Sequence, residues 1–316
     1  MISTSSSIES INMKIVFAGT PANAAETLRQ LANNGHDIVA VLTREDAVSG
    51  RDRELKQSPV AATAQALGIP VLKANRVSEQ LIHDVAKFEA DIGVVVAYGL
   101  IMPQTLLDAP RLGWYNLHYS LLPKYRGAAP VQGALLNGDT ETGVTLFKLD
   151  EGMDTGDIVG TVNTIIEPEE NSAELLQRLT QLGISLLLQE LPRLFSETAS
   201  LLQQNGNPTY AHKITRAQAK VDFSQPAAEV ANLVRAMNPE PMAWFIYDGV
   251  PIRILRAKEV ANLHNLKPAE LATTPVVSIG FANSSALELI EVQPQGKRVM
   301  AAVDWARGLR NIGVLS

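Results

Sequence analysis

Short apolar runs alternate with helical patterns along the first hundred residues of the chain. The pattern predicts strands at residues 13–19, 37–43 and 71–74, and helices at residues 21–34 and 59–67. Ser58 followed by Pro59 is typical of a helix start, and Gly35 and Gly68 are typical of helix ends. This strand–helix–strand rhythm predicts an α/β arrangement of layers.

The next elements indicate how those strands are covered. Residues 91–99, DIGVVVAYG, are apolar without alternation, as expected of a strand with both faces buried. We therefore predict a doubly wound, mostly parallel sheet, in which ligands bind beyond the carboxyl ends of the strands. Leucines at helical spacing in residues 172–195 predict a long packed helix, which Pro192 should end or kink.

The last hundred residues have a different pattern. After a helical segment at 227–237 come short strand-like runs, and Asp248-Gly249 is a hairpin signal between two of them. This pattern is typical of a small β-barrel. We therefore expect a disordered leader at 1–12, a catalytic domain at 13–197, a linker at 198–216 and a β-barrel domain at 217–316.

Composition narrows the function classes. The 316 residues contain no cysteine, which excludes disulfides, a thiolate nucleophile and a zinc–thiolate site, and the five histidines are too scattered to predict a metal cluster. A formal charge of −6 disfavours non-specific nucleic-acid binding, so an RNA partner would have to meet local basic patches. No long apolar span or secretory signal is present, so we expect a cytoplasmic protein.

Three polar side chains in residues 116–157 form a candidate site. Asn116 and His118 are two apart in a predicted strand and therefore share one face, while Leu117 points to the other. Asp154 follows a second predicted strand at 144–149, in a glycine-flanked turn that can approach that face. An amide donor, an imidazole and a carboxylate are the groups an acyl-transfer site needs. By spacing alone, a structural histidine is the commoner interpretation.

Three further segments allow two interpretations each. Gly19 and Thr20 lie at a helix start without a dinucleotide or P-loop motif, so they either hold an anion or form a tight turn. Residues 44–57 are a long polar stretch, and residues 196–220 are a second one. Composition alone favours a solvated loop for the first, and leaves a tether and a binding surface equally open for the second.

Longer strings in the chain resemble a known family. They are FAGTP (17–21), VVAYGL (95–100), NLHYSLLPKYRGAAPVQGALLNGD (116–139) and GVTLFKLDEGMDTGDI (143–158). The resemblance continues more weakly through TYAHKIT and RAMNPEP, and so covers nearly the whole chain. These strings resemble the folate-dependent formyltransferases, and most closely the members that act on initiator tRNA. The resemblance implies a Rossmann-like formyltransferase domain followed by an OB-like barrel.

The resemblance also implies the chemistry and the residues. A formyl group would pass from 10-formyltetrahydrofolate to the amino group of methionine carried by initiator tRNA, without a metal or a covalent intermediate. Asn116 would stabilise the oxyanion, His118 would carry a proton, and Asp154 would orient His118. Folate would be contacted by residues in two segments, namely Ser120, Leu121, Leu122 and Pro123 in one and Val96, Ala97 and Tyr98 in the other.

Partners follow from the same resemblance. Cationic residues expected to bind tRNA are Arg51, Arg53 and Lys56 in the first polar stretch and Lys213, Arg216 and Lys220 in the second. We expect a monomer that does not bind membranes. Two positions depart from the family, Tyr119 where a small residue is common and Glu240 where an aromatic is typical. The alternatives are a formyltransferase acting on a nucleotide or aminosugar amine, and a catalytically silent RNA-binding module.

Overall fold

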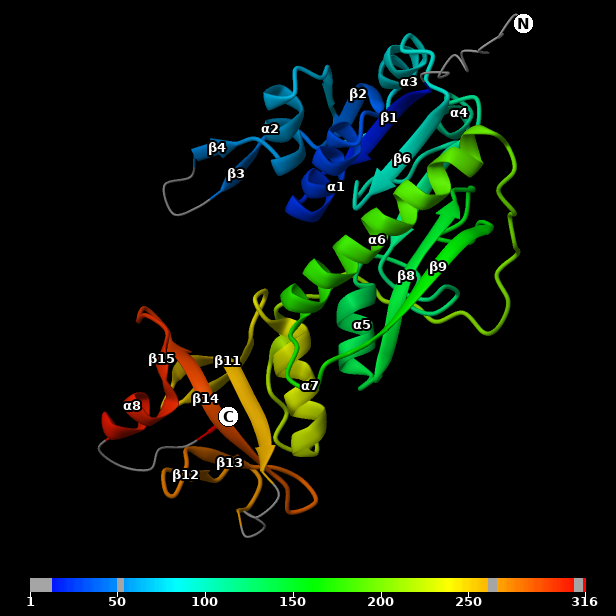
Figure 1. The fold of residues 1–316 in the computed structure, drawn as a ribbon. Coiled ribbons are helices and arrows are strands. Elements are labelled where there is room, and N and C mark those ends of the chain that lie inside the picture. The colour runs from blue at the N-terminus through cyan, green and yellow to red at the C-terminus, as the bar shows by residue number, and fades with distance from the viewer. Residues whose placement is uncertain (1–12, 50–53, 261–265, 310–314) are drawn as a thin grey trace, which may run out of the picture. The chain divides into compact units, whose positions relative to one another are not determined.

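The computed structural model describes residues 13–49, 54–260, 266–309 and 315–316 (Figure 1). The expected leader, residues 1–12, therefore lies outside the described residues. The chain forms two compact units. Unit 1 comprises the chain up to His118 with Val144–Val162 and Thr180–Gly206; unit 2 comprises Tyr119–Gly143, Asn163–Leu179 and the chain from Asn207 on.

Seven of the described strands form the larger sheet. In sheet order they are β5 (Val71–Lys73), β2 (Asp37–Thr43), β1 (Lys14–Gly19), β6 (Ile92–Val96), β7 (Trp114–His118), β8 (Glu141–Lys148) and β9 (Ile158–Ile165). The pairs β5–β2, β2–β1, β1–β6 and β6–β7 are parallel, and β7–β8 is antiparallel. The prediction of a mostly parallel, doubly wound sheet is confirmed.

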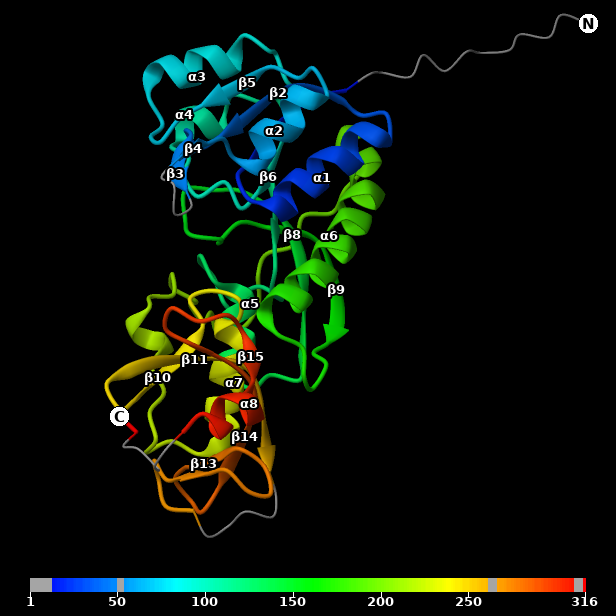
Figure 2. The same cartoon turned by 90° about the vertical axis from the view of Figure 1, so that its left-hand side faces the viewer.

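Helices pack on both faces of this sheet. Four of them are α1 (Ala22–Asn33), α2 (Pro59–Ala66), α3 (Glu79–Ala86) and α4 (Gln104–Leu107). Helices α1 and α2 lie side by side (Figure 2), and each contacts β2. Leu81 of α3 and Leu106 of α4 bury themselves with Val16 and Val95, on the face opposite Phe17. Burial on both faces explains why β1 and β6 carry apolar residues without alternation.

Local signals fix the helix starts. The Ser58 hydroxyl accepts a hydrogen bond of 3.0 Å from the backbone N–H of Ala61, so α2 begins as its Ser-Pro pair predicts. A long helix, α6 (Ser172–Phe195), matches the predicted leucine pattern, and Pro192 lies inside its last turn. The shorter helix α5 (Pro130–Leu136) also begins with a proline.

One local assignment differs from the sequence reading. The first polar stretch, read as a loop, contains two short strands, β3 (Ala47–Ser49) and β4 (Glu54–Lys56). They pair antiparallel with Val48 opposite Leu55, and both of these side chains are exposed. Two strands of three residues each are held together by cross-strand hydrogen bonds. The polar composition of the stretch gives no indication of this pairing.

Unit 2 contains the smaller sheet and its core. The sheet order is β10 (Ala243–Tyr247), β11 (Val250–Val260), β14 (Ala286–Pro294), β13 (Ser278–Gly280) and β12 (Leu271–Ala272), and β15 (Met300–Ala301) pairs with β14. Unit 2 also contains α5, α7 (Ala227–Met237), α8 (Ala302–Arg307) and a 3-10 turn, η1 (Ala217–Ala219). Asp248 and Gly249 both have positive φ, and they form the predicted hairpin between β10 and β11.

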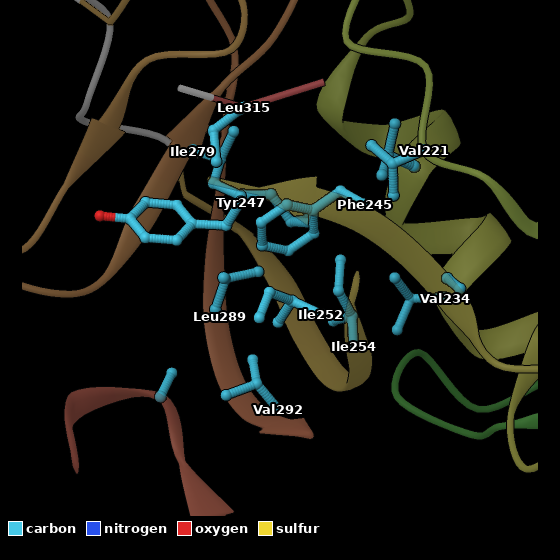
Figure 3. Packing of buried hydrophobic residues seen from close by; sticks show 14 of the residues in the cluster. Val221, Val234, Phe245, Tyr247, Ile252, Ile254, Ile279, Leu289, Val292 and Leu315 are labelled. Carbon is cyan, nitrogen blue, oxygen red and sulfur yellow. The ribbon is translucent and has the colours of Figure 1, made fainter. Parts of the chain in front are cut away.

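Figure 3 shows how this core is filled. Phe245 of β10 is fully buried and packs with Ile252, Ile254 and Leu289. These residues come from neighbouring antiparallel strands, and their side chains meet on one face of the sheet. Among the described residues no helix is long and apolar enough to cross a membrane.

Candidate active site

The strand order reverses between β1 and β6. From β1 the sheet continues through β2 and β5 on one side, and from β6 through β7 on the other. At such a switch point a crevice opens at the carboxyl ends of the two central strands. A hydrogen bond of 3.1 Å from Thr20 Oγ1 to the Tyr98 carbonyl joins the loops that leave these strands. Val96, Ala97 and Tyr98 therefore lie at this switch point.

Asn116 and His118 lie on β7, the strand beside β6. Asn116 stands opposite Val95 of β6, and the extended backbone turns Asn116 and His118 to the same face. Leu117 points to the other face and lies beside Gly183 of α6. The His118 side chain is only 5% exposed, so it lies in an environment with little water.

Asp154 comes to His118 from the turn after β8. Its Oδ2 lies 3.6 Å from His118 Nδ1, and its side chain is 15% exposed. At this separation the imidazole and the carboxylate interact electrostatically. The structure thus brings together an imidazole and a carboxylate that are 36 positions apart in the sequence.

The turn that carries Asp154 is held from a distant segment. The side-chain amide of Gln204 donates to the backbone oxygens of Asp154 and Gly156, at 2.8 and 2.9 Å. A Cβ on Gly156 would lie 1.8 Å from the Lys148 carbonyl oxygen, so only glycine fits there. Sequence reasoning missed Gln204 because it lies in a polar run, where one glutamine has no distinguishing pattern.

Two buried polar atoms in unit 1 lack a hydrogen-bond partner among the described residues. They are the Tyr98 hydroxyl and Asn116 Oδ1. Leaving a buried polar group unpaired costs about 1–3 kcal/mol, so such atoms suit a ligand that supplies the partner. Burial also raises the pKa of the Tyr98 phenol, which keeps its proton available for donation. A flat heterocycle with polar edges, such as the pterin of a folate, fits this chemistry.

Comparisons with known proteins agree with this geometry. The family model described as formyl transferase matches residues 13–191, and the model of the formyl transferase C-terminal domain matches residues 213–310. The chain belongs to the formyl transferase family. The family and the fold class predicted from the sequence are therefore confirmed.

Two relatives with high sequence identity are methionyl-tRNA formyltransferases. The methionyl-tRNA formyltransferase of Leifsonia xyli subsp. xyli is 45% identical over 304 residues, covering 96% of this chain and all of that protein. The methionyl-tRNA formyltransferase of Thermobifida fusca is 43% identical over 301 residues, covering 94% of this chain and 97% of that protein.

The solved structures are more distant. The N-formyltransferase from Helicobacter canadensis, in complex with folinic acid and dTDP-3-aminofucose, has a TM-score of 0.69 and 20% identity. The match covers 88% of this chain and 98% of that one. HypX from Aquifex aeolicus, in complex with tetrahydrofolic acid, has a TM-score of 0.66 and 16% identity, over 94% of this chain and 47% of that one. At these identities the likeness shows the fold alone.

The second segment expected to contact folate in this formyl transferase, residues 120–123, belongs to unit 2. The Ser120 hydroxyl donates to the Lys124 carbonyl at 2.5 Å, and Leu122 is buried. Tyr119, which departs from the family pattern, is buried as well.

The cations expected to bind tRNA fall into two groups. Arg51 and Arg53 lie outside the described residues, and Lys56 is exposed at the end of β4. In unit 2, the charged groups of Arg216 and Lys220 each lie 5.8 Å from the centre of the Trp244 ring. An aromatic face attracts such cations and holds them in place.

Unit 2 also contains a cavity of about 1000 Å³. Lys213, Arg216 and Arg253 line it together with Glu240, the second departure from the family. Its apolar part comes from residues such as Ile214. One carboxylate among three cations leaves the wall positive, which suits a phosphate-bearing ligand. The structure thus places Lys213, Arg216 and Arg253 in the wall of one cavity.

Proposed function

We propose that this protein transfers the formyl group of 10-formyltetrahydrofolate to the amino group of methionine carried by initiator tRNA. The observation that carries the proposal is the 45% identity to a methionyl-tRNA formyltransferase along that protein's whole length. The trio of Asn116, His118 and Asp154 supports it, because a protein that only binds RNA has no need of a buried imidazole beside a carboxylate. The formylated methionyl-tRNA would then be used in translation initiation.

Asn116 would act on the oxygen of the formyl group. Negative charge develops on this oxygen as the amine attacks, and the Asn116 side-chain amide donates a hydrogen bond to it. One such donor contributes about 2.7–4 kcal/mol to transition-state stability in related acyl transfers. The position of Asn116 on a packed central strand supports this role, because a rigid donor needs no rearrangement during the reaction.

His118 and Asp154 would move protons. The attacking amine must lose a proton and the departing folate nitrogen must gain one, so a single imidazole between them serves both steps. Asp154 would stabilise the protonated imidazole through the 3.6 Å approach to Nδ1. The folate supplies the formyl group, and Val96, Ala97 and Tyr98 with residues 120–123 would hold it.

The parts of the chain would have different roles. Residues 13–197 would carry the chemistry, and the linker and barrel would bind tRNA together with the stretch that holds Arg51, Arg53 and Lys56. Lys213, Arg216 and Lys220 would contact tRNA phosphates. We propose that the protein works as a monomer in the cytoplasm. Sedimentation of the purified chain, alone and with tRNA, tests the oligomeric state.

One incubation decides the acceptor. The protein is mixed with 10-formyltetrahydrofolate and, in parallel, with methionyl-initiator tRNA, glycinamide ribonucleotide, a dTDP-aminosugar and free methionine. We expect formylation of the methionyl-tRNA alone. Turnover of a nucleotide or aminosugar amine instead would replace the proposal with the small-molecule alternative. Binding of tRNA without any turnover would favour the catalytically silent RNA-binding module.

A further inference from the structure

Two aromatic rings lie parallel on the surface of unit 2. Tyr210 and His212 are stacked with their ring centres 6.4 Å apart and their planes at 8°. Tyr210 is 55% exposed, and His212 is exposed too. Being two apart on extended backbone, they point the same way, and Ala211 between them is buried. The pair therefore lies on the surface of unit 2 instead of filling its core.

The backbone under the two rings is fixed. The Arg126 N–H donates to the Thr209 carbonyl and the Ala211 N–H donates to the Arg126 carbonyl, both at 2.8 Å. The Ala129 N–H donates to the Ala211 carbonyl at 3.1 Å. The segment expected to be an interdomain linker is thus tied, at these residues, to the loop before α5. Rings on such a support lose little freedom when a ligand stacks on them.

Two cationic side chains follow closely in the chain. Lys213 and Arg216 form no ion pair with any described residue, and both line the 1000 Å³ cavity of unit 2. An exposed aromatic pair followed by such cations has the composition of a surface for single-stranded nucleic acid, where bases stack and phosphates meet Lys and Arg. An apolar protein partner would gain nothing from these cations.

The spacing of the rings agrees with a base as ligand. Successive bases are separated by about 3.4 Å in a nucleic-acid strand, so one base between two parallel rings needs a separation of about 6.8 Å. The ring centres are 6.4 Å apart, which is the largest spacing that the two nearly parallel planes can have, so the exposed rings must move apart to admit a base. We propose that Tyr210 and His212 clamp one unpaired base from the single-stranded 3′ end of the tRNA, whose phosphates lie against Lys213 and Arg216. This inference rests on the proposed function.

The test compares two RNAs. Equilibrium binding is measured with uncharged initiator tRNA and with the same tRNA lacking its unpaired 3′ nucleotides, for wild type, Tyr210→Ala, Tyr210→Phe and His212→Ala. Loss of a base–aromatic stack should weaken binding of the intact tRNA by about five- to thirty-fold for Tyr210→Ala. Binding of the truncated tRNA should change less than about twofold. Tyr210→Phe keeps the ring and should bind both RNAs like wild type.

Salt dependence separates stacking from charge. Lys213→Ala should reduce the slope of log affinity against log salt by about 0.7–0.9, the contribution of one phosphate contact, whereas Tyr210→Ala should leave the slope unchanged. Val303→Ala, an exposed apolar residue of α8, is the control for a general surface effect. Its binding of both RNAs should equal that of wild type.

Failure of the base clamp and failure of the proposed function would give different results. Equal affinities of wild type and Tyr210→Ala for intact tRNA, or an equal loss for both RNAs, would overturn the base clamp. Should Tyr210→Ala melt at a clearly lower temperature, His212→Ala replaces it under the same criteria. A wild-type protein that neither binds nor formylates methionyl-tRNA would instead refute the proposed function, and the wild-type assay alone reports that result.

Discussion

Two histidines of this protein stand in the same local pattern and in opposite surroundings. His118 follows Asn116 by two residues on β7, and His212 follows Tyr210 by two residues on extended backbone. His118 is buried and lies 3.6 Å from the Asp154 carboxylate, whereas His212 is exposed and stacked on a ring. Burial and the neighbouring group, not the spacing in the sequence, therefore distinguish the two imidazoles.

The largest effect should come from removing the charge beside His118. We expect Asp154→Asn to lower kcat about a hundredfold or more, because general acid–base catalysis contributes about 10²–10⁴ and depends on the orientation of the imidazole. Asparagine is the suitable replacement because Asp154 has a φ of 52°, which asparagine tolerates and alanine does not.

A neighbouring carboxylate provides the control. Asp150 accepts hydrogen bonds from the Gly152 N–H and the Thr155 hydroxyl in the same turn, and an asparagine oxygen can replace it there. Asp150→Asn should therefore keep kcat within a few-fold of wild type. Single-turnover formylation of methionyl-tRNA measures both variants. A near-normal rate for Asp154→Asn would remove the carboxylate from the mechanism.

The next effect concerns the core that supports the exposed surface of unit 2. Phe245 is fully buried, and Phe245→Ala should lower the free energy of unfolding by about 3–5 kcal/mol. Val250→Ala, at an exposed position of β11, should change it by less than about 0.5 kcal/mol. Urea denaturation followed by circular dichroism measures both. Equal midpoints for the two variants would show that this cluster is not a cooperative core.

A smaller effect is expected at the switch point. Tyr98→Phe removes a buried hydroxyl that has no partner among the described residues, so stability should stay the same or rise slightly. If the hydroxyl bonds to the folate, KM for 10-formyltetrahydrofolate should rise about two- to tenfold while KM for tRNA stays constant. Initial rates at varied folate and a melting curve provide the measurement. An unchanged folate KM would argue that the hydroxyl makes no ligand contact.

The smallest effect concerns a third histidine. Partial burial lowers the pKa of His36 below its ordinary 6.5, so the unfolded chain takes up a proton at higher pH than the folded protein. The stability contributed by neutral His36 is thus present above pH 6.5, and it declines as pH falls until the lower folded pKa is passed. His36→Gln should flatten the stability–pH curve there. Two superimposable curves would contradict this assignment.

Much of the fold could be predicted because its signals are local. The leucine stripe of α6 gave the helix over Ser172–Phe195, and Asp248-Gly249 gave the turn between β10 and β11. The apolar run of β6 indicated burial on both faces, which the helices on either side confirm. The pair of strands β3 and β4 was missed, since each has only three residues and both lie within a largely polar stretch.

The common face of Asn116 and His118 follows from their spacing, because the two-residue period of a strand requires only local backbone geometry. Only the tertiary structure decided that Asp154 meets His118, that Gln204 holds the turn, and that the chain around Ala211 is tied down. These contacts join residues far apart in the chain, and their partners are selected by the packing of whole elements. No short pattern encodes such a choice, because the same polar residues also suit a solvated loop.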